Sequence, residues 1–155
     1  MEIDLSNIVQ TYFMEKMYYN VTELCHIMKK SNADKGLGWH NYSTFYEYLF
    51  SSIRHEPIRL LEVGCNKKGI TLSAWKHYFS NATIINADCE ATTDVPEGTF
   101  FQVINQRSPN EIHALFKKFG GCDIIIDDGV HRFDENMLLL TNSFQYLNDG
   151  GLYII

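Results

Sequence analysis

After residue 57 the chain alternates short apolar runs with amphipathic segments. The apolar runs cover residues 58–63, 82–87, 99–104, 122–126 and 152–155. Several are apolar on consecutive residues, which is typical of strands buried on both faces. Strands that alternate with helices require right-handed crossovers. The pattern therefore predicts an α/β fold with a mostly parallel sheet between two layers of helices.

Three segments between these runs are predicted helices: 70–79, 109–119 and 135–147. The second has the clearest start, because Ser108 is a capping residue, Pro109 suits the first helical position, and Glu111 stands three residues after the cap. In the third, four apolar residues at helical spacing predict one buried face: Met137, Leu140, Phe144 and Leu147.

The first 56 residues show helical periodicity and no strand-like run. Ser6 and Asn20 are candidate N-caps of two helices, and a third apolar-periodic segment covers residues 42–53. A polar, glycine-containing loop, 31–41, precedes this third segment. At 155 residues, we expect a single domain, 1–155, with a helical cap (1–56) and an α/β core (57–155).

Composition and charge narrow the class of protein. With 45% hydrophobic and 21% charged residues the chain has globular composition, and its net charge of -6 makes nucleic acid an unexpected partner. No apolar run reaches the roughly 20 residues of a membrane span, and the N-terminus lacks a basic signal start, so we expect a cytoplasmic protein. The four cysteines form no Cys-x-x-Cys pair, and Cys65 is expected to serve packing.

Ligands of parallel α/β sheets bind beyond the carboxyl ends of the strands, so the loops there carry the candidate chemistry. The first such loop runs from Gly64 to Gly69, and its glycines allow a ligand close to backbone N–H groups. Asn66 replaces the second glycine of the dinucleotide fingerprint, which disfavours pyrophosphate. Asp88 ends the second strand, where a carboxylate accepts hydrogen bonds from ribose hydroxyls; the alternative is a turn residue.

Two further loops hold polar side chains. Asn105 and Gln106 follow the third strand, where neutral amides suit an adenine edge; the alternative is that they are ordinary loop residues. The fourth strand ends in Asp127, Asp128 and, three residues later, His131. Such a cluster is costly unless it is solvated, paired or ligated, so it either binds a cation or moves a proton.

A histidine is suited to remove a proton from a hydroxyl, and a metal beside it lowers the pKa of that hydroxyl. The alternative for this segment is a solvated loop followed by a helix with Asp134 as its N-cap.

Four motifs follow one another along the chain: Leu-Leu-Glu62-Val-Gly64 with Gly69 and Trp75, then Asp88, then Asp127-Asp-Gly-x-His131, then Gly150-Gly-Leu-Tyr-Ile. In this order they resemble the motifs of class I S-adenosylmethionine-dependent methyltransferases. Within that superfamily the chain is similar to the macrolide-sugar O-methyltransferases and the cephalosporin-hydroxylase-like enzymes, whose upstream segment resembles Asp34-Lys-Gly with His40, Tyr42 and Tyr46. The resemblance covers residues 34–155.

The resemblance implies a Rossmann-like, doubly wound αβα fold and S-adenosylmethionine as cofactor. It implies that His131 is the general base and that Asp128 is a catalytic carboxylate that helps to hold magnesium. It assigns the cofactor to Lys35, Glu62, Gly64, Gly69, Asp88, Asn105, Gln106 and Asp127. The implied acceptor is a hydroxyl of a small or glycosylated molecule. Lys35 and His40 would border the site.

Aromatic residues before the first strand are candidates for stacking on a sugar or planar ring of the acceptor, and the alternative is a place in the core. They are Trp39, Tyr42, Phe45 and Tyr46.

The chain departs from this family at its end. The family continues after the fifth strand with Glu-Asp, further metal carboxylates, and then strands six and seven, whereas this sequence ends at Ile155. We expect a free edge on the fifth strand, which favours pairing into a homo-oligomer. The sequence fits a piece of a longer protein, a short domain completed in trans, or a relative that binds cofactor without turnover.

Three functions follow. The first is an S-adenosylmethionine-dependent O-methyltransferase. The second is a non-catalytic S-adenosylmethionine-binding or assembly module, in keeping with the missing Glu-Asp. The third is a nicotinamide (NAD)-dependent oxidoreductase, which Asn66 disfavours.

Overall fold

The computed structural model describes residues 20–65 and 69–155. The predicted first helix with Ser6 as its N-cap, and the position of Asn66, lie outside the described residues. The chain divides into two compact units, Met1–Arg54 and His55–Ile155. That the two units make one domain stays a prediction.

The first unit contains α2 (Glu23–Ser31), α3 (Ser43–Phe50) and a single 3-10 turn, Ser51–Ile53. The prediction that Asn20 caps α2 is wrong. The N-cap is Thr22, whose hydroxyl accepts a hydrogen bond from the Cys25 N–H at 3.3 Å. An N-cap side chain reaches the N–H two or three residues ahead, and Asn20 stands two residues too early.

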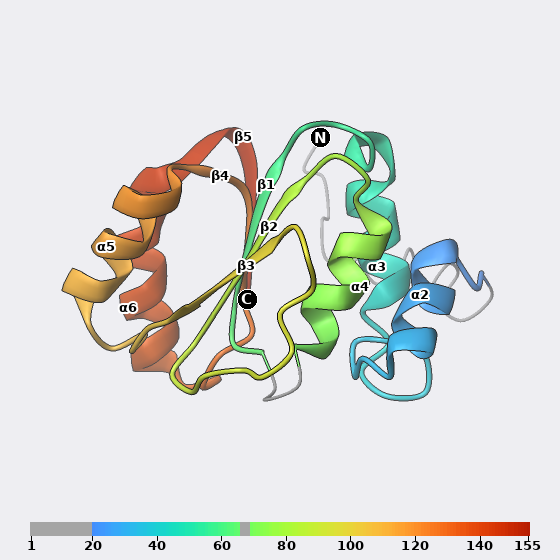
Figure 1. Cartoon of the computed structure of the whole chain (residues 1–155), viewed down its shortest axis with the longest axis horizontal. Coiled ribbons are helices and arrows are strands. Elements are labelled where there is room, and N and C mark those ends of the chain that lie inside the picture. The colour runs from blue at the N-terminus through green and yellow to red at the C-terminus, as the bar shows by residue number, and fades with distance from the viewer. Residues whose placement is uncertain (1–19, 66–68) are drawn as a thin grey trace, which may run out of the picture. The chain divides into compact units, whose positions relative to one another are not determined.

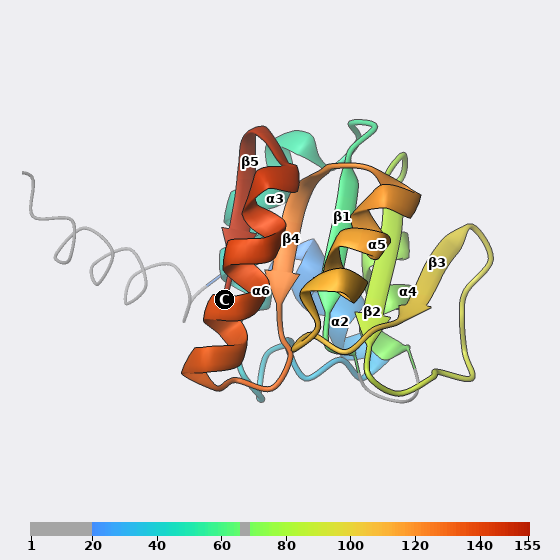
Figure 2. The same ribbon diagram turned by 90° about the vertical axis from the view of Figure 1, so that its left-hand side faces the viewer.

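The second unit is built on five strands: β1 (Arg59–Val63), β2 (Thr83–Asp88), β3 (Thr99–Val103), β4 (Cys122–Asp127) and β5 (Leu147–Ile154). All neighbours pair parallel in the order β3-β2-β1-β4-β5, as Figure 2 shows. The predicted Rossmann-like, doubly wound sheet is confirmed. Strand order reverses between β1 and β4, so a ligand site is expected at their carboxyl ends.

Three helices cover this sheet: α4 (Ile70–Tyr78), α5 (Pro109–Phe119) and α6 (Phe133–Ser143). Figure 1 shows α4 on one face and α5 with α6 on the other. Leu72 and Trp75 of α4 are fully buried. On the opposite face the core includes Ile125 of β4, Phe116 of α5 and Leu139 of α6. Burial of these side chains is the main stabilising contribution to the three layers.

The start of α5 is as predicted, with one difference. Ser108 is the N-cap and accepts from the Glu111 N–H, and Pro109 occupies the first turn. The Glu111 carboxylate, however, accepts from the Asn105 N–H at 2.8 Å instead of returning to Ser108. Glu111 therefore ties the loop after β3 to the helix.

The predicted buried face of α6 is wrong. Met137 is 38% exposed and Phe144 is 60% exposed, whereas Leu139 is fully buried. Residues 138–140 are three consecutive leucines, so helical periodicity fits two different faces, and packing against the sheet selects the one that contains Leu139.

Both ends of the predicted third helix also differ. Arg132, and not Asp134, occupies the N-cap position, with no side-chain hydrogen bond to the helix. The α-helix ends at Ser143, and Leu147 belongs to β5, which begins five residues earlier than predicted. The Asn-Asp-Gly-Gly segment resembles a turn, but the register of β4 with β5 shifts between Cys122 and Ile124 and accommodates it as an irregularity.

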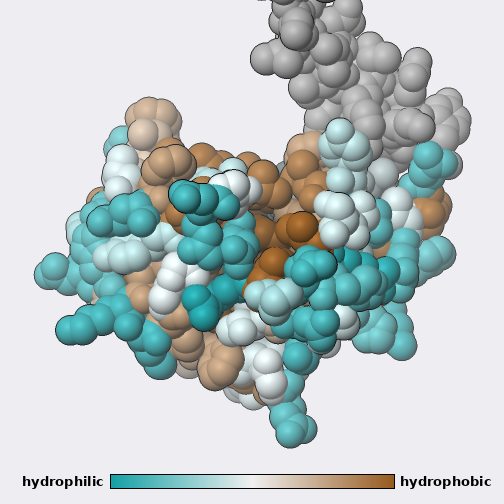
Figure 3. Space-filling model, turned by 90° about the horizontal axis from the view of Figure 1, so that it is seen from above, coloured by the Kyte–Doolittle hydropathy of each residue, from teal (hydrophilic) through white to brown (hydrophobic). Residues whose placement is uncertain are grey.

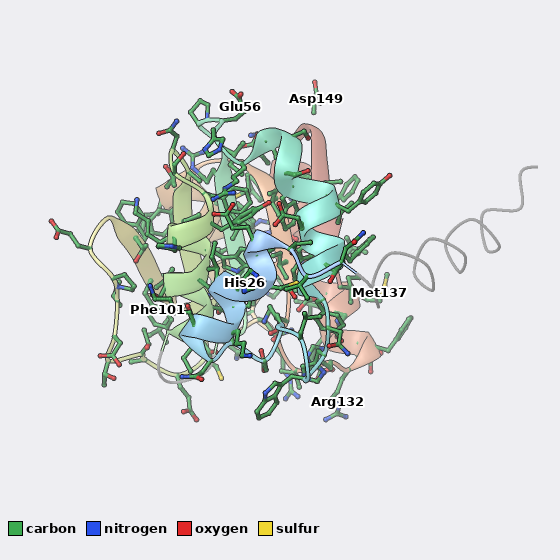
Figure 4. The ribbon with its side chains drawn as sticks, turned by 90° about the vertical axis from the view of Figure 1, so that its right-hand side faces the viewer. His26, Glu56, Phe101, Arg132, Met137 and Asp149 are labelled. Atoms are coloured by element: carbon green, nitrogen blue, oxygen red, sulfur yellow. The ribbon has the colours of Figure 1, made fainter. Side chains whose placement is uncertain are left out.

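The two ends of the sheet differ in what surrounds them. Figure 4 shows Glu56 and Asp149 at the end where strands begin and Arg132 at the end where they finish. Figure 3 views the former end, where hydrophobic residues reach the surface between hydrophilic ones.

Among the described residues, no helix is long and apolar enough to span a membrane.

The Ser108 cap gives a prediction about stability. Ser108→Ala removes the side-chain acceptor of the first turn of α5 and should lower the free energy of unfolding by about 1 kcal/mol. Urea denaturation measures this. Ser73→Ala is the control, because Ser73 is an exposed position inside α4, where alanine favours the helix. An equal loss in both variants would contradict the capping role.

Candidate functional site

A cavity of about 360 Å³ opens at the carboxyl ends of the strands of the second unit. Its walls come from the ends of β1, β2, β3 and β4 and the loops that follow them. The lining residues are Val63, Gly64, Asp88, Cys89, Ile104, Asn105, Gln106, Arg107, Gly129 and Val130. Four predicted site residues are thus brought together: Gly64, Asp88, Asn105 and Gln106. The cavity lies where strand order reverses, as the topology requires.

Gly64 brings the loop after β1 against the loop after β4. Its φ of +89° is in the region that favours glycine, and a Cβ there would lie 2.1 Å from the carbonyl oxygen of Asp128. Its N–H donates to the Ala87 carbonyl at 2.8 Å. No side chain fits at this position, so the backbone itself forms this part of the wall.

Asp88 is fixed at the end of β2 by two backbone donors. Its Oδ2 accepts from the Cys65 N–H at 2.7 Å, and its Oδ1 accepts from the Glu90 N–H at 3.1 Å. Each carboxylate oxygen has two lone pairs, so both can still accept from a diol.

Burial, with Asp88 and Glu62 nearby, raises the pKa of the Cys65 thiol to about 12. Cys65 is therefore a neutral thiol at pH 7, not a nucleophile.

Glu62 lies beneath the first loop and does not line the cavity. It is fully buried, and its Oε2 accepts from Thr71 Oγ1 at 2.5 Å and from Asn86 Nδ2 at 2.7 Å. These bonds join β1, β2 and the first turn of α4. Gly69, at the start of α4, also lies outside the lining; a Cβ there would be 2.3 Å from the Asp94 carbonyl oxygen.

Gln106 crosses from the loop after β3 to the loop after β4. Its Oε1 accepts from the Val130 N–H at 3.2 Å, and the amide packs so closely on Gly129 that a Cβ there would lie 2.1 Å away. Because the oxygen faces Val130, the amide nitrogen faces away from it. That Nε2 is buried and has no hydrogen-bond partner among the described residues. The site therefore contains a buried N–H donor, Gln106 Nε2, that has no acceptor among the described residues.

Asp127 ends β4 as a buried carboxylate. It is 1% exposed, its Oδ1 accepts from the Gly129 N–H at 3.3 Å, and its Oδ2 finds no partner within the described part of the chain. Burial raises the pKa of this carboxyl above its ordinary value. A carboxylate kept at this position costs stability, which points to a role other than packing.

Asp128 and His131 lie together at the start of the next loop. His131 Nε2 is 3.6 Å from Asp128 Oδ1, and the imidazole is 65% exposed. The backbone of His131 has a φ of +53°, a left-handed conformation that is uncommon for residues other than glycine, although histidine adopts it more often than most. Such local strain is often found at functional sites, and here it presents the imidazole to solvent.

Metal ligands are sparse around this pair. Among residues 20–65 and 69–155, no group of three or more His, Cys, Asp or Glu side chains is arranged to hold a metal ion. The assignment of Asp128 to magnesium stays a prediction.

Lys35 and the candidate aromatic residues belong to the first unit. Lys35 is 2% exposed, and its Nζ is 3.8 Å from Asp34 Oδ1. His40 stacks on Tyr42 with ring centroids 5.4 Å apart, and Trp39 is 76% exposed, whereas Tyr46 is buried against Phe50. Tyr46 therefore serves the core of its unit. The roles of Lys35 and of the exposed aromatic residues at a ligand stay predictions.

Sequence reasoning missed several residues of the cavity wall. Arg107, Gly129 and Val130 line it and were not singled out, although each lies two to four residues beyond the end of a strand. Position relative to a predicted strand end was the available signal. Side-chain type alone did not identify them.

Comparison with curated proteins gives sugar O-methyltransferases. An 8-demethyl-8-(2-methoxy-alpha-L-rhamnosyl)-tetracenomycin-C 3'-O-methyltransferase of Streptomyces olivaceus is 26% identical over 140 residues, 86% of this chain and 36% of that protein. Demethylmacrocin O-methyltransferase of Streptomyces fradiae is 30% identical over 123 residues, 75% of this chain and 31% of that protein. The chain thus spans about a third of the length of these curated relatives. No family model matches it.

Among solved structures, the MycE methyltransferase of the mycinamycin biosynthetic pathway, in complex with Mg and SAH (S-adenosylhomocysteine), has the same fold. It aligns with a TM-score of 0.81 and 23% identity over 86% of this chain and 39% of that one. A second MycE structure, which also holds mycinamycin VI, aligns with a TM-score of 0.80 and 21% identity over 98% of this chain and 47% of that one. Together these matches confirm the predicted resemblance and the fold.

The raised pKa of Asp127 gives a pH-dependent prediction. A carboxyl whose folded pKa exceeds its unfolded pKa stabilises the fold while it is protonated, and that stability is lost as pH rises through the folded pKa. Asp127→Asn removes the buried charge. The variant should therefore have a higher Tm than the unmodified chain at about pH 7, and the difference should shrink toward about pH 4.

Thermal unfolding across this pH range measures the difference. Asp149→Asn, at an exposed position in β5, is the control. An Asp127→Asn variant that is less stable at neutral pH would contradict this account of the buried carboxylate.

Proposed function

We propose that this chain, which resembles the class I S-adenosylmethionine-dependent methyltransferases of the macrolide-sugar branch, binds S-adenosylmethionine and takes part in methylating a hydroxyl group. The acceptor we propose is a small or glycosylated molecule, as in the names of its relatives. The net charge of -6 disfavours a nucleic acid acceptor.

One observation carries the proposal, namely the fixed carboxylate of Asp88 in the wall of a cavity at the switch point of the sheet. Asp88 suits a ribose, and Gln106 offers a buried N–H donor to a base. Gly64 lets the ligand approach backbone instead of a side chain. This donor set fits a nucleoside-type cofactor, which when bound supplies a methyl group on a positively charged sulfur.

The residues of the chain then have to align the acceptor and remove its proton. We assign proton removal to His131, whose Nε2 would accept the proton of the acceptor hydroxyl. The carboxylate of Asp128, 3.6 Å away, would stabilise the imidazolium that results.

A second candidate is a module that binds S-adenosylmethionine without transferring its methyl group. Cofactor binding is common to both candidates. Methyl transfer separates them.

Cofactor binding is tested by titration calorimetry with S-adenosylhomocysteine. Asp88→Ala should weaken binding by about 10- to 100-fold, since it removes charged hydrogen-bond acceptors from the cavity wall. Glu97→Ala is the control, because Glu97 is an exposed carboxylate in the loop between β2 and β3. Failure of the folded chain to bind the ligand would refute both candidates.

Proton removal is tested with a methyl acceptor such as mycinamycin VI. His131→Gln should lower the rate of methyl transfer by about 10²- to 10⁴-fold at unchanged affinity for S-adenosylhomocysteine. His77→Gln, at an exposed position in α4, is the control. Tight cofactor binding with no transfer by the unmodified chain would favour the non-catalytic module.

A further inference from the structure

An ion pair between a half-exposed arginine and a buried glutamate joins the cavity wall to the first turn of α6. The guanidinium of Arg107, in the loop after β3, donates through Nη2 to Oε1 of Glu135, and Arg107 is part of the cavity lining. Glu135 is only 7% exposed, although it stands at the start of a surface helix. Arg132 approaches the other oxygen of Glu135, with Nε 3.8 Å from Oε2, but Arg132 does not line the cavity.

From this arrangement we infer that Glu135 is a positioning residue, which acts through Arg107 to hold the loop after β3 at the wall of the cavity. The inference rests on the proposed function of the cavity as a cofactor site. Glu135 itself is not among the residues that line the cavity.

The charge state of Glu135 fits this role. Its partial burial acts to raise the pKa of the carboxyl, but hydrogen bonds from its own backbone N–H and from Arg107 outweigh it, and the net pKa lies below the ordinary value. Glu135 is therefore ionised at neutral pH. A buried carboxylate needs a partner, and Arg107 provides the direct one.

Other contacts hold the same segment of the loop after β3. Gln106, one residue before Arg107, accepts through Oε1 from the Val130 N–H in the loop after β4. Arg107 itself donates its backbone N–H to Asn105 Oδ1 at 3.0 Å. The segment 105–107 is thus held by Glu111 of α5, by the Val130 N–H and by Glu135, and of these contacts only the one with Glu135 joins it to α6.

The competing account is that Glu135 only stabilises the start of α6, where a negative charge is favourable in any case. The two accounts differ in what Arg107 and Arg132 do. For helix stability both arginines place a positive charge near one carboxylate, Arg107 in a hydrogen bond and Arg132 with its Nε 3.8 Å from Oε2. For the cavity they differ, because only Arg107 belongs to its wall.

The experiment measures the affinity for S-adenosylhomocysteine by calorimetry in Glu135→Gln, Arg107→Gln, the double variant and the matched control Arg132→Gln. We expect each of the first two to weaken binding about tenfold and the double variant to be no weaker than either, because both remove one interaction. Arg132→Gln should bind within about twofold of the unmodified chain. Thermal unfolding of each variant confirms that it is folded.

A ligand-free readout separates this inference from the proposed function. Amide hydrogen exchange of residues 105–107 should become faster in Glu135→Gln and Arg107→Gln but not in Arg132→Gln. If the unmodified chain fails to bind S-adenosylhomocysteine, the proposed function falls, and the exchange pattern still tests the tie. Unchanged affinity and exchange in Glu135→Gln, or equal effects of the two arginine variants, would overturn the inference.

Discussion

The contact between the loops that leave β1 and β4 is the constraint on which the site depends. The backbone of Gly64 touches the Asp128 carbonyl so closely that no Cβ fits between them. The Asp128 N–H also donates to the Val63 carbonyl at 2.8 Å. Because these two strands are neighbours at the switch point, the contact fixes the floor from which the other loops build the cavity.

Above this floor the chain retains polar atoms that packing alone does not explain. Gln106 keeps a buried amide N–H and Asp127 a buried carboxylate oxygen, each without a hydrogen-bond partner among the described residues. Buried polar groups in folded proteins are nearly always satisfied, so the Gln106 amide in the cavity wall marks the cavity as a place for a ligand. The fold is less stable for keeping this amide unpaired, and a bound molecule that pairs with it would recover that stability.

Two buried glutamates outside the cavity lining hold in place the elements that form its wall. Glu62 joins β1, β2 and α4 through hydrogen bonds from Thr71 and Asn86, and Glu135 holds Arg107 from α6. Neither carboxylate lines the cavity. The wall residues are thus supported by buried acidic residues on neighbouring elements, which is how a rigid site is built on loops.

The sequence by itself determined the strands, their parallel pairing and the loops that carry Gly64, Asp88, Gln106 and His131, because local patterns and their spacing encode these features. It left the face of α6 open, since three consecutive leucines fit two helical phases and only packing against β4 selects Leu139. It also left open the early start of β5, which depends on pairing with Cys122. The pairing of Arg107 with Glu135 joins residues 28 positions apart. Only the tertiary structure decides such contacts, because they depend on where two loops meet in space and not on any local pattern.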